Sequence, residues 1–152
     1  MTIPEVAAAQ ALLFDGVDRV IAGTAGLDTA GLNWHPPAPD SNSLHAIATH
    51  LLGGTEQLMM SALCRVRPTI RDREAELRSE SDGNVTFAAR WATLRPDIER
   101  ALDALTEADL ADQRPHPRLG PMDGRELLWR TVAHANEHAG HVELTRQLLD
   151  AR

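Results

Sequence analysis

The chain has 152 residues, of which 43% are hydrophobic, and carries a net charge of −7. This length suits one domain with a buried core, so we expect residues 1–152 to form a single domain. The negative charge argues against nucleic acid as a main partner. All 15 basic residues are arginine, which excludes Schiff-base chemistry on lysine and the P-loop motifs that need lysine.

Three features of the sequence bear on where the protein is located, and all three predict the cytoplasm. No apolar run approaches the roughly 20 residues of a membrane helix, so we expect no membrane partner. The N-terminus lacks a basic segment and has the pattern of a helix start, unlike a signal peptide. Cys64 is the single cysteine, so no intramolecular disulfide can form and a cytoplasmic location is expected. We expect Cys64 itself to be a small core residue.

Two long helices are predicted in the first half of the chain. Residues 4–21 have an apolar stripe at helical spacing, and a proline is tolerated in the first helical turn. Glycines, prolines and turn formers then break the pattern over 22–42. The second helix spans 43–66, where Ser43 or one of the two residues before it can cap the start, and Pro68 ends it.

Two more long helices are predicted in the second half. Residues 67–84 are charged and read as a mobile connector with at most a helical turn. The third helix spans 85–105, and Pro96 inside it predicts a kink. After a second long connection over 106–123, the last helix spans 124–150.

Four amphipathic helices in one domain predict an all-α four-helix bundle, with long connections before its second and fourth helices. No segment alternates apolar and polar residues next to a hairpin turn, so we expect no strand.

Three histidines lie close together in the last helix, in the stretch TVAHANEHAGHVELTRQLLD at residues 131–150. A helix turns about 100° per residue, which puts His138 about 40° and His141 about −20° from His134. Leucines of the same helix share this side, so the three imidazoles lie on the face expected to be buried. Buried imidazoles need polar partners or a metal, because an unpaired buried polar group is costly.

The spacing of His134 and His138 can bring two ring nitrogens to one metal ion, and a third ligand is then needed. His50 in the second helix can supply it. Gly53 and Gly54 follow His50 closely, and each costs about 1 kcal/mol in a helix relative to alanine. Such glycines indicate that a neighbouring helix or a ligand approaches there. A set of hydrogen-bonded core histidines remains the alternative.

The segment HANEH also matches the inverted zinc-protease signature H-x-x-E-H, in which Glu137 would be the general base. That class takes its third ligand far downstream, whereas the sequence runs only from 139 to 152 after His138. We therefore set the protease interpretation aside. Glu137 is left as a possible base, a residue supporting the ligands, or a solvated residue at the edge of the face.

Two stretches, LNWHPPAPDSNSLHAIATHLLGGTEQ and EHAGHVELTRQLLD, resemble the DinB/YfiT-like superfamily of metal-binding four-helix bundles. One branch is similar to the N-terminal domain of mycothiol-dependent maleylpyruvate isomerase. The resemblance implies a metal triad of His50, His134 and His138. In the isomerase branch the first ligand of the last helix is a glutamate, where this chain has His134. His141 is expected to be a core residue or to support the ligands.

The remaining histidines are expected to lie away from the site. His45 falls on a different face of its helix from His50 and is expected at the surface or as a cap. His35 and His116 lie in proline-rich segments and are expected to be solvated.

Three neutral imidazoles suit zinc, nickel or ferrous iron and leave positions for water or substrate. The resemblance implies a metal-dependent thiol transferase or isomerase that acts on small electrophiles, with mycothiol, bacillithiol or glutathione as the thiol. The isomerase has a second domain that contributes to its active site and is not matched here, so maleylpyruvate isomerisation is not expected. A non-catalytic, metal-binding, stress-related dimer is the alternative. A homodimer is expected in either case, and no catalytic or thiol-binding residue is assigned.

Overall fold

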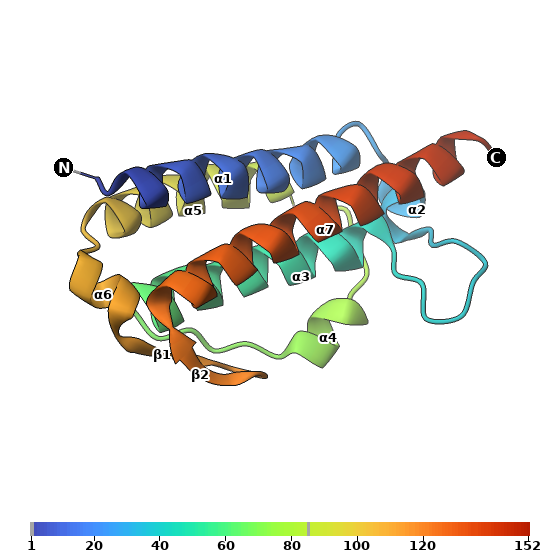
Figure 1. The fold of residues 1–152 in the computed structure, drawn as a ribbon. Coiled ribbons are helices and arrows are strands. Elements are labelled where there is room, and N and C mark those ends of the chain that lie inside the picture. Colours follow the sequence, from blue (N-terminus) through green and yellow to red (C-terminus); the bar gives the residue numbers. More distant parts are fainter. Residues whose placement is uncertain (1, 85) are drawn as a thin grey trace.

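The computed structural model describes residues 2–84 and 86–152. Its four long helical segments are α1 (Pro4–Thr24), α3 (Leu44–Glu56) continued by the π-helix η1 (Gln57–Leu63), α5 (Phe87–Asp103) and α7 (Gly124–Asp150). Both α1 and α3 pack against α7 and α5, so the four segments close around one core (Figure 1). The predicted all-α four-helix bundle is therefore confirmed.

The helix starts follow the expected capping rules. The Ser43 hydroxyl accepts a hydrogen bond from the Ala46 amide at 3.1 Å, and the Asp123 carboxylate accepts one from the Glu126 amide at 2.7 Å. The third predicted helix began at Val85, which lies outside the described residues, and α5 begins at Phe87. Pro96 lies within α5 without ending it.

The connections contain short elements that the sequence did not define. They are α2 (Thr29–Asn33), α4 (Arg73–Leu77), α6 (Glu107–Ala111), β1 (Gln113–His116) and β2 (Gly120–Asp123). The strands β1 and β2 form an antiparallel hairpin, paired from Gln113 opposite Asp123 to His116 opposite Gly120. The prediction that the chain has no strand was therefore wrong. Each strand has four residues and includes a proline, too short for an alternating pattern to be recognised.

Arg114 explains why so short a hairpin is held in place. Its side chain is 2% exposed, and its Nε donates to the Leu63 carbonyl at 2.9 Å. The guanidinium also pairs with Asp109 at 3.0 Å and with Asp112. These contacts fix the hairpin to the end of η1, where it lies below α3 and α7 in Figure 1.

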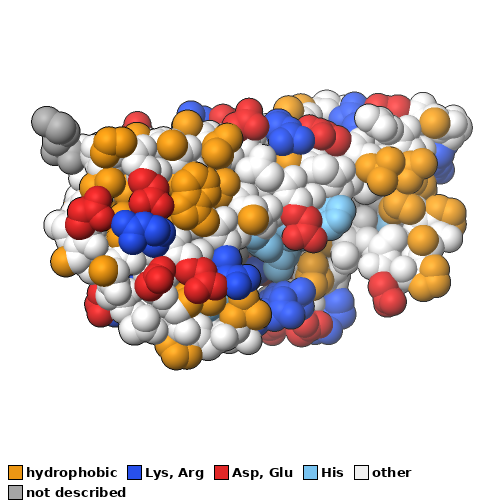
Figure 2. All heavy atoms as spheres, in the orientation of Figure 1, with side chains coloured by type: hydrophobic (Ala, Val, Ile, Leu, Met, Phe, Trp, Pro, Cys, Tyr) orange, Lys and Arg blue, Asp and Glu red, His pale blue; other side chains and the backbone are white. Residues whose placement is uncertain are grey.

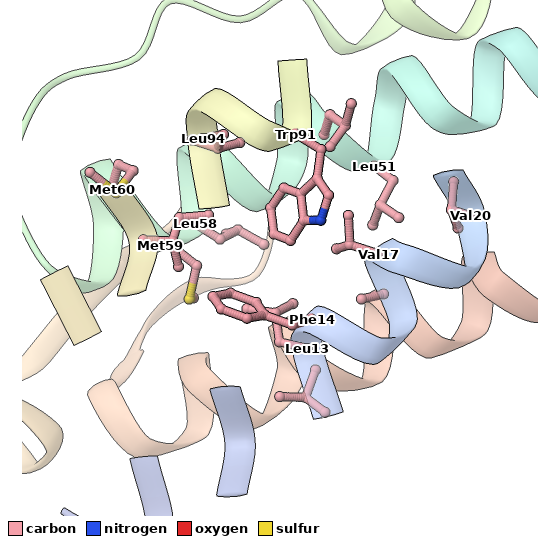
Figure 3. Packing of buried hydrophobic residues seen from close by; sticks show 14 of the residues in the cluster. Leu13, Phe14, Val17, Val20, Leu51, Leu58, Met59, Met60, Trp91 and Leu94 are labelled. Carbon is pink, nitrogen blue, oxygen red and sulfur yellow. The ribbon is translucent and has the colours of Figure 1, made fainter. Parts of the chain in front are cut away.

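The core lies between the four long segments and is mainly aliphatic. Phe14 of α1 meets Trp91 of α5 edge to face, with ring centroids 5.4 Å apart, and leucines and methionines of α3 and η1 pack around them (Figure 3). His45 also lies here, 4% exposed and 5.2 Å from the Phe87 ring. The prediction of a surface or capping role for His45 was wrong, because α5 covers that face of α3 as well.

No helix in the described part of the chain combines the length and the apolar character that crossing a membrane requires.

Candidate metal centre

His50 of α3 meets His134 and His138 of α7 where the two helices pack together. The Nε2 atom of His134 lies 3.3 Å from that of His50 and 3.1 Å from that of His138. One nitrogen from each ring falls within 4.8 Å of the others. The structure therefore brings together the three residues of the predicted triad.

The backbone explains this convergence. His134 and His138 are four residues apart on α7, so they lie one turn apart on the same side. Their rings meet edge to face, as does each of them with His50, with centroids 4.5–5.3 Å apart. The rings are therefore not stacked face to face, and the Nε2 atom of His134 lies within 3.3 Å of the Nε2 atom of each partner.

Burial makes all three rings neutral. Loss of solvent lowers the pKa of His50 and of His134 to about 3, and that of His138 to about 4. For His50 and His134 these values also include smaller contributions from the neighbouring imidazoles and Arg71, which act in the same direction. Each ring is therefore uncharged at neutral pH, which is the form of histidine that binds metals.

The donor set fits a divalent metal. Zinc–nitrogen bonds of about 2.0–2.1 Å in a tetrahedral site place neighbouring nitrogens about 3.3–3.4 Å apart. The Nε2 separations of 3.1 and 3.3 Å around His134 are close to this value. Imidazole donors also suit nickel and ferrous iron. The distances are therefore compatible with a bound metal, as they are with hydrogen bonds between the rings, and they do not identify the metal.

Arg71 and Glu76 surround the outer nitrogen of His50. Arg71 Nη2 lies 2.9 Å from His50 Nδ1 and donates to the His50 carbonyl at 3.1 Å. Glu76 pairs with Arg71 at 2.8 Å, and its Oε2 lies 3.7 Å from His50 Nδ1. An arginine can only donate, so in this arrangement Nδ1 of His50 accepts a hydrogen bond and the proton of the neutral ring is on Nε2.

Gly53 and Gly54 make room for this pair, as the sequence indicated for a close approach. A Cβ atom on Gly53 would lie 2.1 Å from Glu76 Oε1. A Cβ atom on Gly54 would lie 3.4 Å from Arg71 Nη2 and from His134 Cε1. The two glycines thus permit both the approach of α4 and the contact with α7.

Two adjoining cavities open beside the histidines. The first, which we call the polar chamber, measures about 300 Å³ and is lined by all three histidines. Its other charged or polar lining residues include Arg71, Arg73, His116, Arg118 and Glu137. The second, the apolar chamber, measures about 400 Å³ and is lined by His138, His141 and apolar residues such as Ile47, Leu77, Leu144 and Leu148. Figure 2 shows histidine and arginine side chains on one face of the bundle, with hydrophobic side chains toward the C-terminal end of α7.

The residues predicted to support the ligands lie at the edge of the cluster. His141 is exposed and not in the core, and its Nδ1 lies 3.4 Å from Nδ1 of His138. Glu137 is exposed and lines the polar chamber. His35 is exposed as expected and shares a hydrogen bond with Ser41.

His116 is placed differently from the prediction. It is half-buried, and its Nδ1 accepts hydrogen bonds from the amides of Arg118 at 3.1 Å and Leu119 at 3.0 Å. The expectation that His116 is simply solvated was therefore wrong, because the hairpin carries it to the wall of the polar chamber. Its Nδ1 is an acceptor, so the Nε2 atom of the neutral ring carries the proton.

Sequence reasoning missed Arg71, Glu76 and Arg118 as residues of the site. The two glycines after His50 were the only signal that something approaches α3, and they did not reveal what it was.

Cys64 lies away from the histidines. It is half-buried against the core, and burial raises the pKa of its thiol to about 12. It therefore stays protonated and takes no part in the site.

Comparison with known proteins agrees with this architecture. A crystal structure of a conserved protein from Enterococcus faecalis has a TM-score of 0.75 and 15% identity, over 100% of this chain and 99% of that one. The crystal structure of a histidine-to-alanine mutant of mycothiol-dependent maleylpyruvate isomerase has a TM-score of 0.60 and 14% identity over 92% of this chain. The chain spans 61% of that isomerase.

No curated protein is similar enough in sequence to count as a match. The model of the DinB superfamily matches residues 12–142, which include α3, α5, most of α7 and all three converging histidines. This confirms the family resemblance inferred from the two sequence stretches. The chain belongs to the DinB superfamily.

Proposed function

We propose that the protein binds one divalent metal ion through His50, His134 and His138 and acts as a metal-dependent thiol transferase or isomerase on small electrophiles. The observation that carries this proposal is the convergence of three neutral imidazole nitrogens at the wall of an open cavity. A bound divalent metal supplies Lewis acidity, which lowers the pKa of a thiol or of water.

The bond changes of a thiol transfer are simple. The sulfur electron pair of the thiolate forms the new carbon–sulfur bond, and the leaving group departs with the pair of the bond that breaks. The thiol proton passes to solvent. The Glu137 carboxylate lines the polar chamber and is exposed, so it can relay that proton from the chamber to solvent. An isomerase adds the thiolate and later expels it, so the thiol is recovered.

Glu76 has a distinct part in this proposal. A His50 ring that binds a metal through Nε2 must carry its proton on Nδ1, and that proton needs an acceptor. Arg71 cannot accept, whereas Glu76 Oε2 lies 3.7 Å away. We therefore assign to Glu76 the role of accepting the Nδ1 proton, which requires Arg71 Nη2, now 2.9 Å from Nδ1, to move aside while Arg71 Nη1 keeps its contact with Gln57.

The identity of the thiol is also a proposal. One structural neighbour is named as a mycothiol-dependent enzyme, which supports a small thiol as cosubstrate, with mycothiol, bacillithiol and glutathione as candidates. The alternative of a non-catalytic metal-binding protein expects a crowded site. The chamber of about 300 Å³ at the three histidines favours the enzyme. The expected homodimer stays a prediction that sedimentation would test.

The test begins with metal analysis of protein purified without a histidine tag. A metal content near one ion per chain, before or after adding zinc or nickel, is expected. Loaded protein is then incubated with each thiol and with epoxide or halogenated electrophiles, and the adducts are measured by mass spectrometry. A protein that takes up neither metal refutes the metal site. A loaded protein that forms no adduct with any thiol refutes the transferase.

A further inference from the structure

We propose that the two chambers bind different substrates: the polar chamber binds a carboxylate-bearing thiol, and the apolar chamber binds the apolar body of the electrophile. This assignment rests on the proposed function and extends it to the classes of both substrates. It is drawn from the charges, unpaired donors and lining residues of the two cavities.

The polar chamber has cationic donors that lack protein partners. Arg73 Nε is buried and has no hydrogen-bond partner among the described residues, although Nη1 of the same side chain pairs with Glu74 at 3.0 Å. The Arg118 side chain is exposed and makes no hydrogen bond or ion pair within the described part of the chain, so its guanidinium can turn to a ligand in the chamber. A buried donor without an acceptor costs free energy. A ligand oxygen in this chamber that accepts a hydrogen bond from Arg73 Nε would remove that cost.

Charge points to the same ligand. The chain has a net charge of −7, yet three arginines line the polar chamber and Glu137 is its one acidic lining residue among those the structure describes. Arg71 and Arg73 are paired with carboxylates outside this lining, and Arg118 has no such partner among the described residues. Guanidinium groups bind carboxylates with two parallel hydrogen bonds, which favours a carboxylate over a neutral polar group. The chamber therefore fits a small thiol that carries a carboxylate.

The apolar chamber differs in charge, because no arginine lines it among the described residues and Asp40 is its one acidic lining residue there. Ile47, Leu77, Leu144 and Leu148 form much of its wall. The Leu144 and Leu148 side chains are 57% and 45% exposed, so they offer apolar surface that a ligand can cover. Burying such surface contributes about 25 cal/mol per Å², which favours an electrophile with an aliphatic or aromatic body.

The positions of the histidines decide which substrate enters which chamber. His50, His134 and His138 all line the polar chamber, whereas His138 alone of the three lines the apolar one. A thiol in the polar chamber therefore reaches the point where the three Nε2 atoms converge. Asn42, Leu77 and His138 line both chambers, so an electrophile in the apolar chamber meets the thiol at this shared wall.

Cobalt(II)-loaded protein allows thiol binding to be measured without turnover, because thiolate binding to cobalt adds a near-ultraviolet absorption band. The probes are β-mercaptopropionate and its neutral amide, β-mercaptopropionamide. We expect the acid to bind at least about tenfold more tightly than the amide. Arg118→Ala should remove most of this preference, while Arg100→Ala, an exposed arginine of α5, should retain it.

N-phenylnaphthylamine, a neutral probe that fluoresces when bound in apolar sites, tests the other chamber. Leu148→Glu should weaken its binding about tenfold or more and leave the affinity for β-mercaptopropionate unchanged. Leu12→Glu is the matched control, because Leu12 is 48% exposed and lies on α1, away from both chambers.

The outcomes separate this assignment from the function on which it rests. If the acid and amide bind equally, or if Leu148→Glu leaves probe binding intact, the assignment is wrong and the thiol function stands. If neither thiol produces the band in protein that has bound cobalt, the thiol function fails and the assignment fails with it. If each variant weakens both probes equally, the chambers act as one pocket and the division is overturned.

Discussion

The two faces of α7 are built for different purposes. Toward α1, the helix presents small residues that allow close packing: Ala135 and Ala139 are fully buried. A Cβ atom on Gly16 of α1 would lie 3.1 Å from the Ala135 backbone, and one on Gly23 would lie 2.1 Å from Val142 Cγ1. On this face the helices touch almost backbone to backbone.

Toward α3, the same helix presents His134 and His138, with His141 at the edge, and two chambers adjoin them. Here polar rings occupy positions where a bundle normally has leucine, so apolar contact is replaced by nitrogen donors. One helix therefore packs against the bundle through one face and carries the candidate metal centre on the other. The two faces should therefore respond differently to mutation.

The largest expected effect is on the α3 face. His138→Ala removes a proposed ligand and should reduce metal affinity by more than about 100-fold, beyond the range for residues that only support ligands. Isothermal titration with zinc measures the change. His141→Ala should keep most of the affinity, and His35→Ala all of it. Equal losses from His138→Ala and His141→Ala would mean that the ligand pair on α7 is misassigned.

The four long helices were predictable because their signals are local. The apolar spacing, the cap at Ser43, and the glycine- and proline-rich connections each act within a few residues. The hairpin was not predictable, because the buried contact of Arg114 with the Leu63 carbonyl holds it, and that contact joins residues 51 positions apart. His45 was misplaced because helical angle alone does not say how many neighbouring helices cover a face.

The site was predictable only in part. Spacing and family resemblance together predicted His50, His134 and His138 as ligands, and the structure brings these residues together; their binding of a metal stays a prediction. Arg71 and Glu76 lie in a charged connector, where composition predicts solvation and not contact. Only the path of the folded chain turns them toward His50, so no local pattern could have identified them.

The next largest effect should appear on the α1 face, as a change in stability. Gly16→Leu forces a side chain against the Ala135 backbone, where a Cβ atom alone would be 3.1 Å away. We expect the free energy of unfolding to fall by about 3 kcal/mol, measured by urea denaturation of metal-free protein. The zinc stoichiometry of the folded protein should not change. A loss of metal binding in folded protein would show that the two faces are not independent.

A smaller effect is expected from the residues around His50. Glu76→Gln weakens the acceptor assigned to the His50 Nδ1 proton and should lower zinc affinity by roughly 10- to 100-fold. Gly53→Ala should lower it less, because the new Cβ atom displaces the flexible end of Glu76, whose Oε1 would lie 2.1 Å away. Alanine favours the helix by about 1 kcal/mol, which offsets the cost of disturbing the ion pair between Glu76 and Arg71, so the stability of the variant should stay close to that of the parent.

Gly53→Ala thus separates metal affinity from stability. Its counterpart is Gly54→Ala, where the nearest atoms would lie 3.4 Å from the new Cβ atom and ordinary contact suffices. That variant should bind zinc nearly as well as the parent protein. If Gly53→Ala binds zinc normally while Glu76→Gln does not, the glycine has no part in placing Glu76.

The smallest effect is the pH dependence that the histidine face gives to metal-free protein. Burial lowers the pKa of His134 to about 3, against about 6.5 in the unfolded chain. Between these values the unfolded state binds more protons than the folded state, so stability is fully present above about pH 6.5 and falls as the pH is lowered. The loss from this one residue is at most about 1.4 kcal/mol per pH unit.

Urea denaturation between neutral pH and mild acid should therefore show the parent losing more stability than His134→Asn, which lacks the titrating ring. On the α1 face, Gly16→Leu should lower stability by the same amount at every pH. Parallel pH profiles for the parent and His134→Asn would mean that this histidine is not held neutral in the fold, and the difference drawn between the two faces of α7 would then not include charge.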